Sequence, residues 1–180
     1  MLSVSTLKFN LPTLLTLSRI ILIPVFLFTV YQHPVFGAFI FIIASITDFL
    51  DGYLARRSGE VTKFGIILDP IADKFLVISA LIVLVEMERL QAWIAIIIIV
   101  REFLVTGLRV VALSKDIIIP AETGGKIKTT LQITAIICLI LMKSIVNIHL
   151  YDIGIILIWI AMVLSIVSGV KYTISFWKKI

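Results

Sequence analysis

Residues 36–85 read FGAFIFIIASIT-DFLDGYLARRSGEVTKFGIILDPIADK-FLVISALIVLV, so that two apolar flanks enclose a short acidic passage. Four aspartates of this passage, Asp48, Asp51, Asp69 and Asp73, lie beside or within its apolar segments. An ionised carboxylate within a membrane segment is costly, and four of them need compensating partners. A divalent cation such as Mg²⁺ is a natural partner for hard oxygen ligands, and it also binds phosphates. The stretch therefore predicts a membrane-embedded metal site for a phosphate-bearing substrate.

The composition supports a membrane location. The chain has 180 residues, of which 61% are hydrophobic, and a mean hydropathy of +1.18. These values are far above those of a soluble domain of this length and indicate an all-α, polytopic membrane protein. The net charge of +5 does not indicate nucleic-acid binding, because the basic residues cluster beside the apolar spans. Cys138 is the single cysteine, which excludes an intramolecular disulfide, and we expect it to pack as a small apolar residue.

Six segments are long and apolar enough to cross a bilayer. We predict transmembrane helices at about 12–31, 36–57, 65–86, 89–113, 124–146 and 152–175. Residues 1–10 are too short and mixed to cross, and they suit a segment that lies along the headgroups. No internal repeat or second domain is visible, so residues 1–180 are expected to form a single membrane domain.

The distribution of lysine and arginine predicts the orientation. One side carries Lys8, Arg19, Arg56, Arg57, Lys63, Lys115, Lys126, Lys171, Lys178 and Lys179, whereas only Arg89 and Lys143 fall near the other. Positive residues accumulate on the cytoplasmic side of membrane proteins. We therefore expect both termini and the acidic passage to face the cytoplasm.

The spacing of the carboxylates allows them to converge. Asp48 and Asp51 are three residues apart and Asp69 and Asp73 four apart, so each pair shares one face of its helix. The short connection at 57–64 makes the two helices antiparallel neighbours. Both pairs lie at a similar distance from this connection, so they can bind one or two cations together.

The neighbours of the carboxylates fit a phosphate-bearing ligand. Gly52 and Gly65 offer bare backbone that a nucleotide can approach closely. Arg56, four residues after Gly52, can hold a phosphate oxygen bidentately. The simpler interpretation is that the carboxylates only neutralise Arg56, Arg57, Lys63 and Lys74 at a buried interface. The combination of four carboxylates with glycines and Arg56 in register favours a functional site.

The pattern D-x-x-D-G-x-x-A-R-x₈-G-x-x-x-D-x-x-x-D, which spans residues 48–73, resembles the signature of the CDP-alcohol phosphotransferases. The resemblance implies six transmembrane helices around a cytoplasm-facing metal site, usually in a homodimer. It implies that Asp48, Asp51 and Asp69 bind Mg²⁺ or Mn²⁺, and that Asp73 is the general base and a further ligand. It also places Gly52, Ala55, Arg56 and Gly65 where the family contacts the CDP moiety.

Basic residues of the fourth and fifth spans suit an acceptor that carries its own phosphate. Arg101 is near mid-membrane, where a cation needs a polar cavity, and Arg109 follows two turns later. Lys126 and Lys128 point in different directions on a helix, and Lys128 shares its face with Gln132. Alternatively, Arg109 and one lysine reach lipid headgroups, and Glu102 pairs with a cation of a neighbouring span.

The flanking strings FNLPTLLTLSRIILIP, REFLVTGLR and GKIKTTLQ resemble one branch of that family, the bacterial phosphatidylglycerophosphate synthases. The resemblance implies that CDP-diacylglycerol donates its phosphatidyl group to sn-glycerol 3-phosphate and releases CMP. A cardiolipin synthase of the same fold, with phosphatidylglycerol as acceptor, is the nearest alternative. A divalent-cation transporter is an alternative of another class, but its carboxylates should lie near the bilayer midplane rather than near the helix ends.

Overall fold

The computed structural model describes the backbone of residues 11–58, 63–114, 124–141 and 149–178, and the side chains of residues 21–47, 74–112, 127–141 and 149–178. The described residues form six helices and no strand. These are α1 (Leu11–Gln32), α2 (Pro34–Ser58), α3 (Lys63–Glu86), α4 (Ala92–Ser114), α5 (Gly124–Leu141) and α6 (Leu150–Trp177). The prediction of six helices is confirmed. Residues 1–10, predicted to lie along the headgroups, and residues 142–146, predicted to end the fifth span, lie outside the described part.

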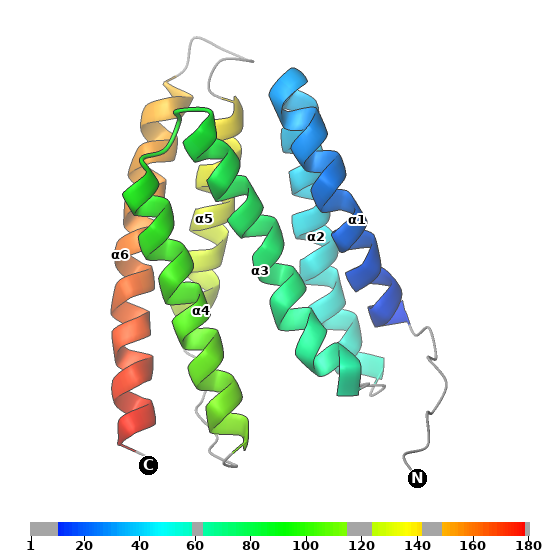
Figure 1. Cartoon of the computed structure of the whole chain (residues 1–180), viewed down its shortest axis with the longest axis vertical. Helices are drawn as coiled ribbons and strands as arrows, with labels where there is room; N and C mark the ends of the chain where they lie inside the picture. The colour runs from blue at the N-terminus through cyan, green and yellow to red at the C-terminus, as the bar shows by residue number, and fades with distance from the viewer. Residues whose placement is uncertain (1–10, 59–62, 115–123, 142–148, 179–180) are drawn as a thin grey trace.

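Consecutive helices run in opposite directions along a single bundle (Figure 1). α1 packs on α2 and α3, while α6 packs on α4 and α5. Contacts of α5 with α2 and α3, and of α4 with α3, join these two groups. As a result, the C-terminal end of α2, the N-terminal end of α3 and the N-terminal end of α5 lie at the same end of the bundle (Figure 1).

The surface and the core are both apolar. Phe26 of α1 and Phe41 of α2 are fully buried and their rings pack at 5.7 Å between centroids, whereas Phe28, two residues along α1, is 79% exposed. Outward-facing large apolar side chains occur on all six helices within the described part, and such a surface is suited to lipid. α6 has 28 residues and contains an 18-residue stretch with a mean hydropathy of 2.6, so it is long and apolar enough to cross a bilayer of about 30 Å. The protein is a helical membrane protein.

The α1–α2 connection is unusually tight. His33 alone separates the two helices, and Pro34 occupies the first turn of α2, where its missing N–H is not needed. Gly37 then faces α1 so closely that a Cβ atom at this position would lie 2.6 Å from the Cα of Val30. Any larger residue would push the two helices apart.

The start of the fourth helix was predicted at residue 89, but α4 begins at Ala92. Glu88 adopts a φ of 58°, and the N–H groups of Glu88 and Arg89 donate to the carbonyls of Val85 and Leu84. This is the hydrogen-bond pattern of a Schellman motif. Residues 87–91 therefore close the end of α3 instead of opening α4.

Candidate active site

The backbone of the acidic passage has the predicted form. Asp48 and Asp51 lie within the continuous helix α2, and Asp69 and Asp73 lie within α3. α2 and α3 contact each other, and the ends that carry these residues lie at the same end of the bundle (Figure 1). The other residues predicted to contact the CDP moiety, Gly52, Ala55, Arg56 and Gly65, belong to the same two helix ends. The side chains of all eight residues lie outside the part that the structure describes.

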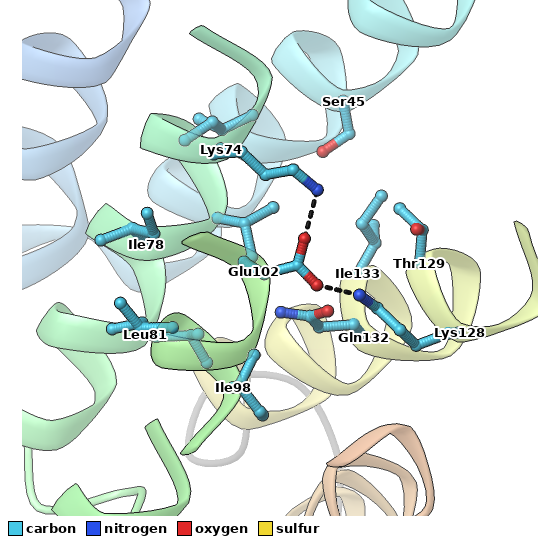
Figure 2. Close-up of a pocket in the computed structure, with 13 residues that line it drawn as sticks. Ser45, Lys74, Ile78, Leu81, Ile98, Glu102, Lys128, Thr129, Gln132 and Ile133 are labelled. Atoms are coloured by element: carbon cyan, nitrogen blue, oxygen red, sulfur yellow. Dashed lines mark hydrogen bonds and ion pairs between the residues drawn. The ribbon is translucent and has the colours of Figure 1, made fainter. Parts of the chain in front are cut away.

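A buried ion cluster lies next to this passage. The carboxylate of Glu102 on α4 pairs with the ammonium groups of Lys74 on α3 and Lys128 on α5 (Figure 2). The side chains of Glu102 and Lys128 are only 7% and 4% exposed. Lys74 directly follows Asp73, so the cluster begins within one residue of the acidic passage. A single carboxylate thus joins three helices.

Arg101 connects this cluster to α6. Its Nη1 atom lies 3.0 Å from Oε1 of Glu102, its Nε donates to the carbonyl of Ser165 at 2.7 Å, and its Nη2 donates to Oγ of Ser168 at 2.5 Å. Gly169 leaves the space for this side chain, because a Cβ atom there would lie 3.1 Å from Cγ of Arg101. The guanidinium is therefore held between α4 and α6.

A cavity of about 240 Å³ lies beside the cluster, between α2, α3, α4 and α5. Its polar lining consists of Ser45, Lys74, Glu102, Lys128, Thr129 and Gln132, and its apolar lining of Leu76, Val77, Ile78, Leu81, Ile98, Ile99 and Ile133. Val77 lies four residues after Asp73, and Ser45 three residues before Asp48. Residues at these spacings share a helical face. The cavity therefore lies along the same faces of α2 and α3 as the carboxylates, one helical turn further from the connection between these helices.

The predicted acceptor residues have different surroundings. Lys128 lines the cavity, and Arg101 meets the same carboxylate from the side of α6. Arg109 on α4 is exposed, and the side chain of Lys126 lies outside the described part. Of the predicted residues whose side chains are described, the structure thus brings Arg101 and Lys128 together at Glu102.

Sequence reasoning missed most of the cavity lining. The alternative in which Glu102 pairs with a cation of a neighbouring span is confirmed, with Lys74 and Lys128 as the partners. Glu102 is the one acidic residue of α4, and a lone carboxylate within an apolar span signals such partners. No sequence signal indicated that Ser45 and Thr129 would line a common cavity.

Comparison with known proteins agrees with this architecture. The family description CDP-alcohol phosphatidyltransferase matches residues 9–167. A CDP-diacylglycerol–glycerol-3-phosphate 3-phosphatidyltransferase of Bacillus subtilis (strain 168) is 41% identical over 186 residues, which cover 94% of this chain and 96% of the relative. The enzyme of that name from Rickettsia bellii (strain RML369-C) is 43% identical over 168 residues, covering 91% and 93%.

A third relative with the same name, from Haemophilus influenzae (strain ATCC 51907 / DSM 11121 / KW20 / Rd), is 41% identical over 174 residues, which cover 92% of each chain. The match to the family description includes the acidic passage and both helices that carry it. The chain therefore belongs to the CDP-alcohol phosphatidyltransferase family.

Proposed function

We propose that this protein transfers the phosphatidyl group of CDP-diacylglycerol to sn-glycerol 3-phosphate, which releases CMP and forms phosphatidylglycerol phosphate. The observation that carries the proposal is the extent of the similarity: relatives with the corresponding enzyme name cover more than nine-tenths of this chain at 41–43% identity. The four carboxylates at the adjoining ends of α2 and α3 support the same reaction, because carboxylate oxygens can hold a divalent cation and such a cation binds the phosphates of a pyrophosphate donor.

The reaction requires one bond to form and one to break. The acceptor hydroxyl oxygen attacks the phosphorus that carries the diacylglycerol. The bond from this phosphorus to the bridging oxygen of the pyrophosphate breaks, and CMP leaves with the electron pair. The hydroxyl proton passes to a carboxylate, for which we propose Asp73 as general base.

Enzymes of this family use a divalent metal. The donor set fits such an ion, because Asp48, Asp51, Asp69 and Asp73 supply hard carboxylate oxygens of the kind that Mg²⁺ and Mn²⁺ prefer. We propose these four residues as its ligands. When bound, the metal would supply neutralisation of the charge that develops on the pyrophosphate.

The donor and the acceptor would use different parts of the site. For the CDP moiety we propose Gly52, Ala55, Arg56 and Gly65, which lie on the two helix ends that carry the carboxylates. For the phosphate of the acceptor we propose Arg101, Arg109, Lys126 and Lys128, which belong to the facing helices α4 and α5.

The distribution of lysine and arginine supports an orientation of the protein in the membrane. We propose one multi-pass domain over residues 1–180 in the cell (inner) membrane, with the acidic helix ends and both termini facing the cytoplasm. We further propose that the protein acts as a homodimer.

An acceptor screen tests the function. Purified protein is given CDP-diacylglycerol, a divalent metal and labelled glycerol 3-phosphate, inositol phosphate, serine or phosphatidylglycerol, and the lipid product and released CMP are measured. We expect phosphatidylglycerol phosphate from glycerol 3-phosphate. A cardiolipin product from phosphatidylglycerol would replace the proposed acceptor, and failure to release CMP with any acceptor would contradict the reaction class.

The screen has a variant that links the activity to the carboxylates. Asp69→Asn keeps the size of the side chain but removes the proposed ligand charge, so activity should fall by orders of magnitude. Asp152→Asn is the matched control, because Asp152 is exposed in the first turn of α6, at the opposite end of the bundle (Figure 1). Near-normal turnover of Asp69→Asn at low metal concentration would exclude Asp69 as a ligand.

A further inference from the structure

Glu102 divides its two carboxylate oxygens between different parts of the site. Oε1 accepts hydrogen bonds from Nη1 of Arg101 and Nζ of Lys128, two of the residues proposed for the acceptor phosphate. Oε2 accepts a hydrogen bond from Nζ of Lys74, which directly follows the proposed general base Asp73. Figure 2 shows the carboxylate between the two ammonium groups. One side chain thus links the proposed acceptor residues to the helix that carries the general base.

The carboxylate of Glu102 is itself held from two sides. Arg101 is fixed against α6, where its Nε donates to the carbonyl of Ser165 and its Nη2 to Oγ of Ser168. Lys74 holds the second carboxylate oxygen from α3. The side chain of Glu102 is 7% exposed, so little water competes for these bonds. The direction of the carboxylate is therefore set by contacts with α3 and α6.

Lys128 is a side chain that needs such an anchor. A lysine has a flexible four-carbon stem that ends in a compact charge, so packing alone does not fix the direction of its ammonium group. Lys128 lines the cavity and pairs there with Glu102. An ammonium group has three N–H donors, so a bond to Glu102 leaves donors for a phosphate oxygen. Glu102 can thus direct Lys128 without using all of its donors.

We propose that Glu102 is a positioning residue for acceptor binding: its Oε1 atom fixes the ammonium group of Lys128 where this group meets the acceptor phosphate. The inference rests on the proposed function, which assigns Lys128 to that phosphate. The charge of Glu102 would by itself have the opposite effect, because a carboxylate repels a phosphate. Position and charge therefore predict different results when Glu102 is replaced.

The test is a double-mutant cycle on KM for glycerol 3-phosphate, measured on purified protein in detergent with CDP-diacylglycerol and Mg²⁺. Glu102→Asp keeps the charge but withdraws the carboxylate by one methylene, and misplacement by about 1 Å can cost about 100-fold. We expect KM to rise about tenfold in this variant and about ten- to a hundredfold in Lys128→Met. In the double variant KM should stay within about threefold of that of Lys128→Met, because a positioning residue has no effect without the group that it positions.

Two further measurements separate positioning from a purely structural or electrostatic role. KM for CDP-diacylglycerol should change little in Glu102→Asp, which also shows that the variant is folded, since its carboxylate still compensates the buried cations. Glu102→Gln should raise KM for glycerol 3-phosphate, whereas loss of a repelling charge alone would lower it. Glu86→Gln is the matched control, because Glu86 is exposed at the end of α3, and it should leave both KM values unchanged.

Four results would overturn the inference. These are a wild-type KM for glycerol 3-phosphate in Glu102→Asp, an equal rise of both KM values in that variant, a lowered KM for glycerol 3-phosphate in Glu102→Gln, and a double variant whose KM shows the product of the single effects. In each case the wild type still uses glycerol 3-phosphate, so the proposed function stands. If the wild type does not use glycerol 3-phosphate while another acceptor reacts, the proposed function fails, and the inference fails with it.

Discussion

Glu102 shows how one residue can decide the arrangement of several helices. Its buried carboxylate meets three cations, Lys74 of α3, Arg101 of α4 and Lys128 of α5, and it offsets part of the cost of burying their charge. Removal of one partner of a buried ion pair is more harmful than absence of the pair, because the other partner stays buried without compensation. Lys128, which is 4% exposed, would be that stranded partner.

Glu102→Gln should therefore lower the free energy of unfolding by about 3 kcal/mol, the effect of breaking a buried pair. The measurement is the thermal unfolding of the purified protein in detergent. Glu86→Gln provides the comparison, since Glu86 is exposed at the end of α3 and accepts a hydrogen bond from Tyr31. Equal shifts of the unfolding temperature in the two variants would mean that the Glu102 cluster contributes no more to stability than the exposed Glu86 does.

Asp73 is the residue at which proton transfer and metal binding can be separated. If it accepts the proton of the acceptor, Asp73→Asn should reduce turnover by about 100-fold or more. Binding of CDP-diacylglycerol, measured directly by titration, should change much less. Proportional losses of binding and turnover would assign Asp73 to the metal alone.

At the scale of elements, Arg89 links the turn after α3 to the end of α5. Its Nη1 donates to the carbonyls of Leu139, at 3.2 Å, and Ile140, at 2.5 Å, in the last turn of α5. A cation at this end also opposes the negative end of the helix dipole. Burial lowers the pKa of Arg89, because its positive charge is removed from solvent in the turn between α3 and α4. The two carbonyls offset part of this cost.

Arg89→Ala should destabilise the protein by about 2 kcal/mol, because hydrogen bonds from a charged donor to two buried carbonyls are lost. Arg89→Lys should restore part of the loss, since lysine keeps the charge but not the planar fork. Thermal unfolding in detergent measures both. Lys171→Ala, at an exposed position of α6, should have little effect, and an Arg89→Ala variant as stable as this control would contradict the capping role.

At the scale of the whole molecule, the residues proposed for the donor and those proposed for the acceptor belong to different helices. α2 and α3 carry the carboxylates and Arg56, while α4 and α5 carry Arg109, Lys126 and Lys128. The two groups of helices meet at the contacts of α5 with α2 and α3 and of α4 with α3. Donor and acceptor can therefore be bound by different helices and brought together where these groups meet.

This division predicts opposite kinetic effects. Arg109→Ala and Lys126→Ala should each raise KM for glycerol 3-phosphate by about ten- to a hundredfold, the value of one hydrogen bond to a charged group, with little change in KM for CDP-diacylglycerol. Arg56→Ala should do the reverse. Steady-state kinetics with each substrate varied in turn will measure this, and equal effects of Arg109→Ala on both substrates would contradict a separate acceptor side.

Local patterns in the chain were enough to predict the helices and the acidic passage. Apolar runs of membrane length, broken by short polar connections, predict six spans, and spacings of three and four place Asp48 with Asp51 and Asp69 with Asp73 on single helical faces. Both properties depend only on residues close together in the sequence. The predicted roles of these carboxylates remain proposals, which the Asp69→Asn and Asp73→Asn variants test.

Contacts between distant segments could be found only in the tertiary structure. Arg101 was expected to line an acceptor cavity, yet its guanidinium bonds Ser165 and Ser168, more than sixty residues away. Arg89 appeared only as an exception to the charge asymmetry, yet it caps α5 across fifty residues. The cavity beside Gln132 is likewise lined by residues of four helices, so no single helix predicts it. Charge and periodicity determine which face of a helix is polar, but the packing of the bundle decides which partner each polar group meets.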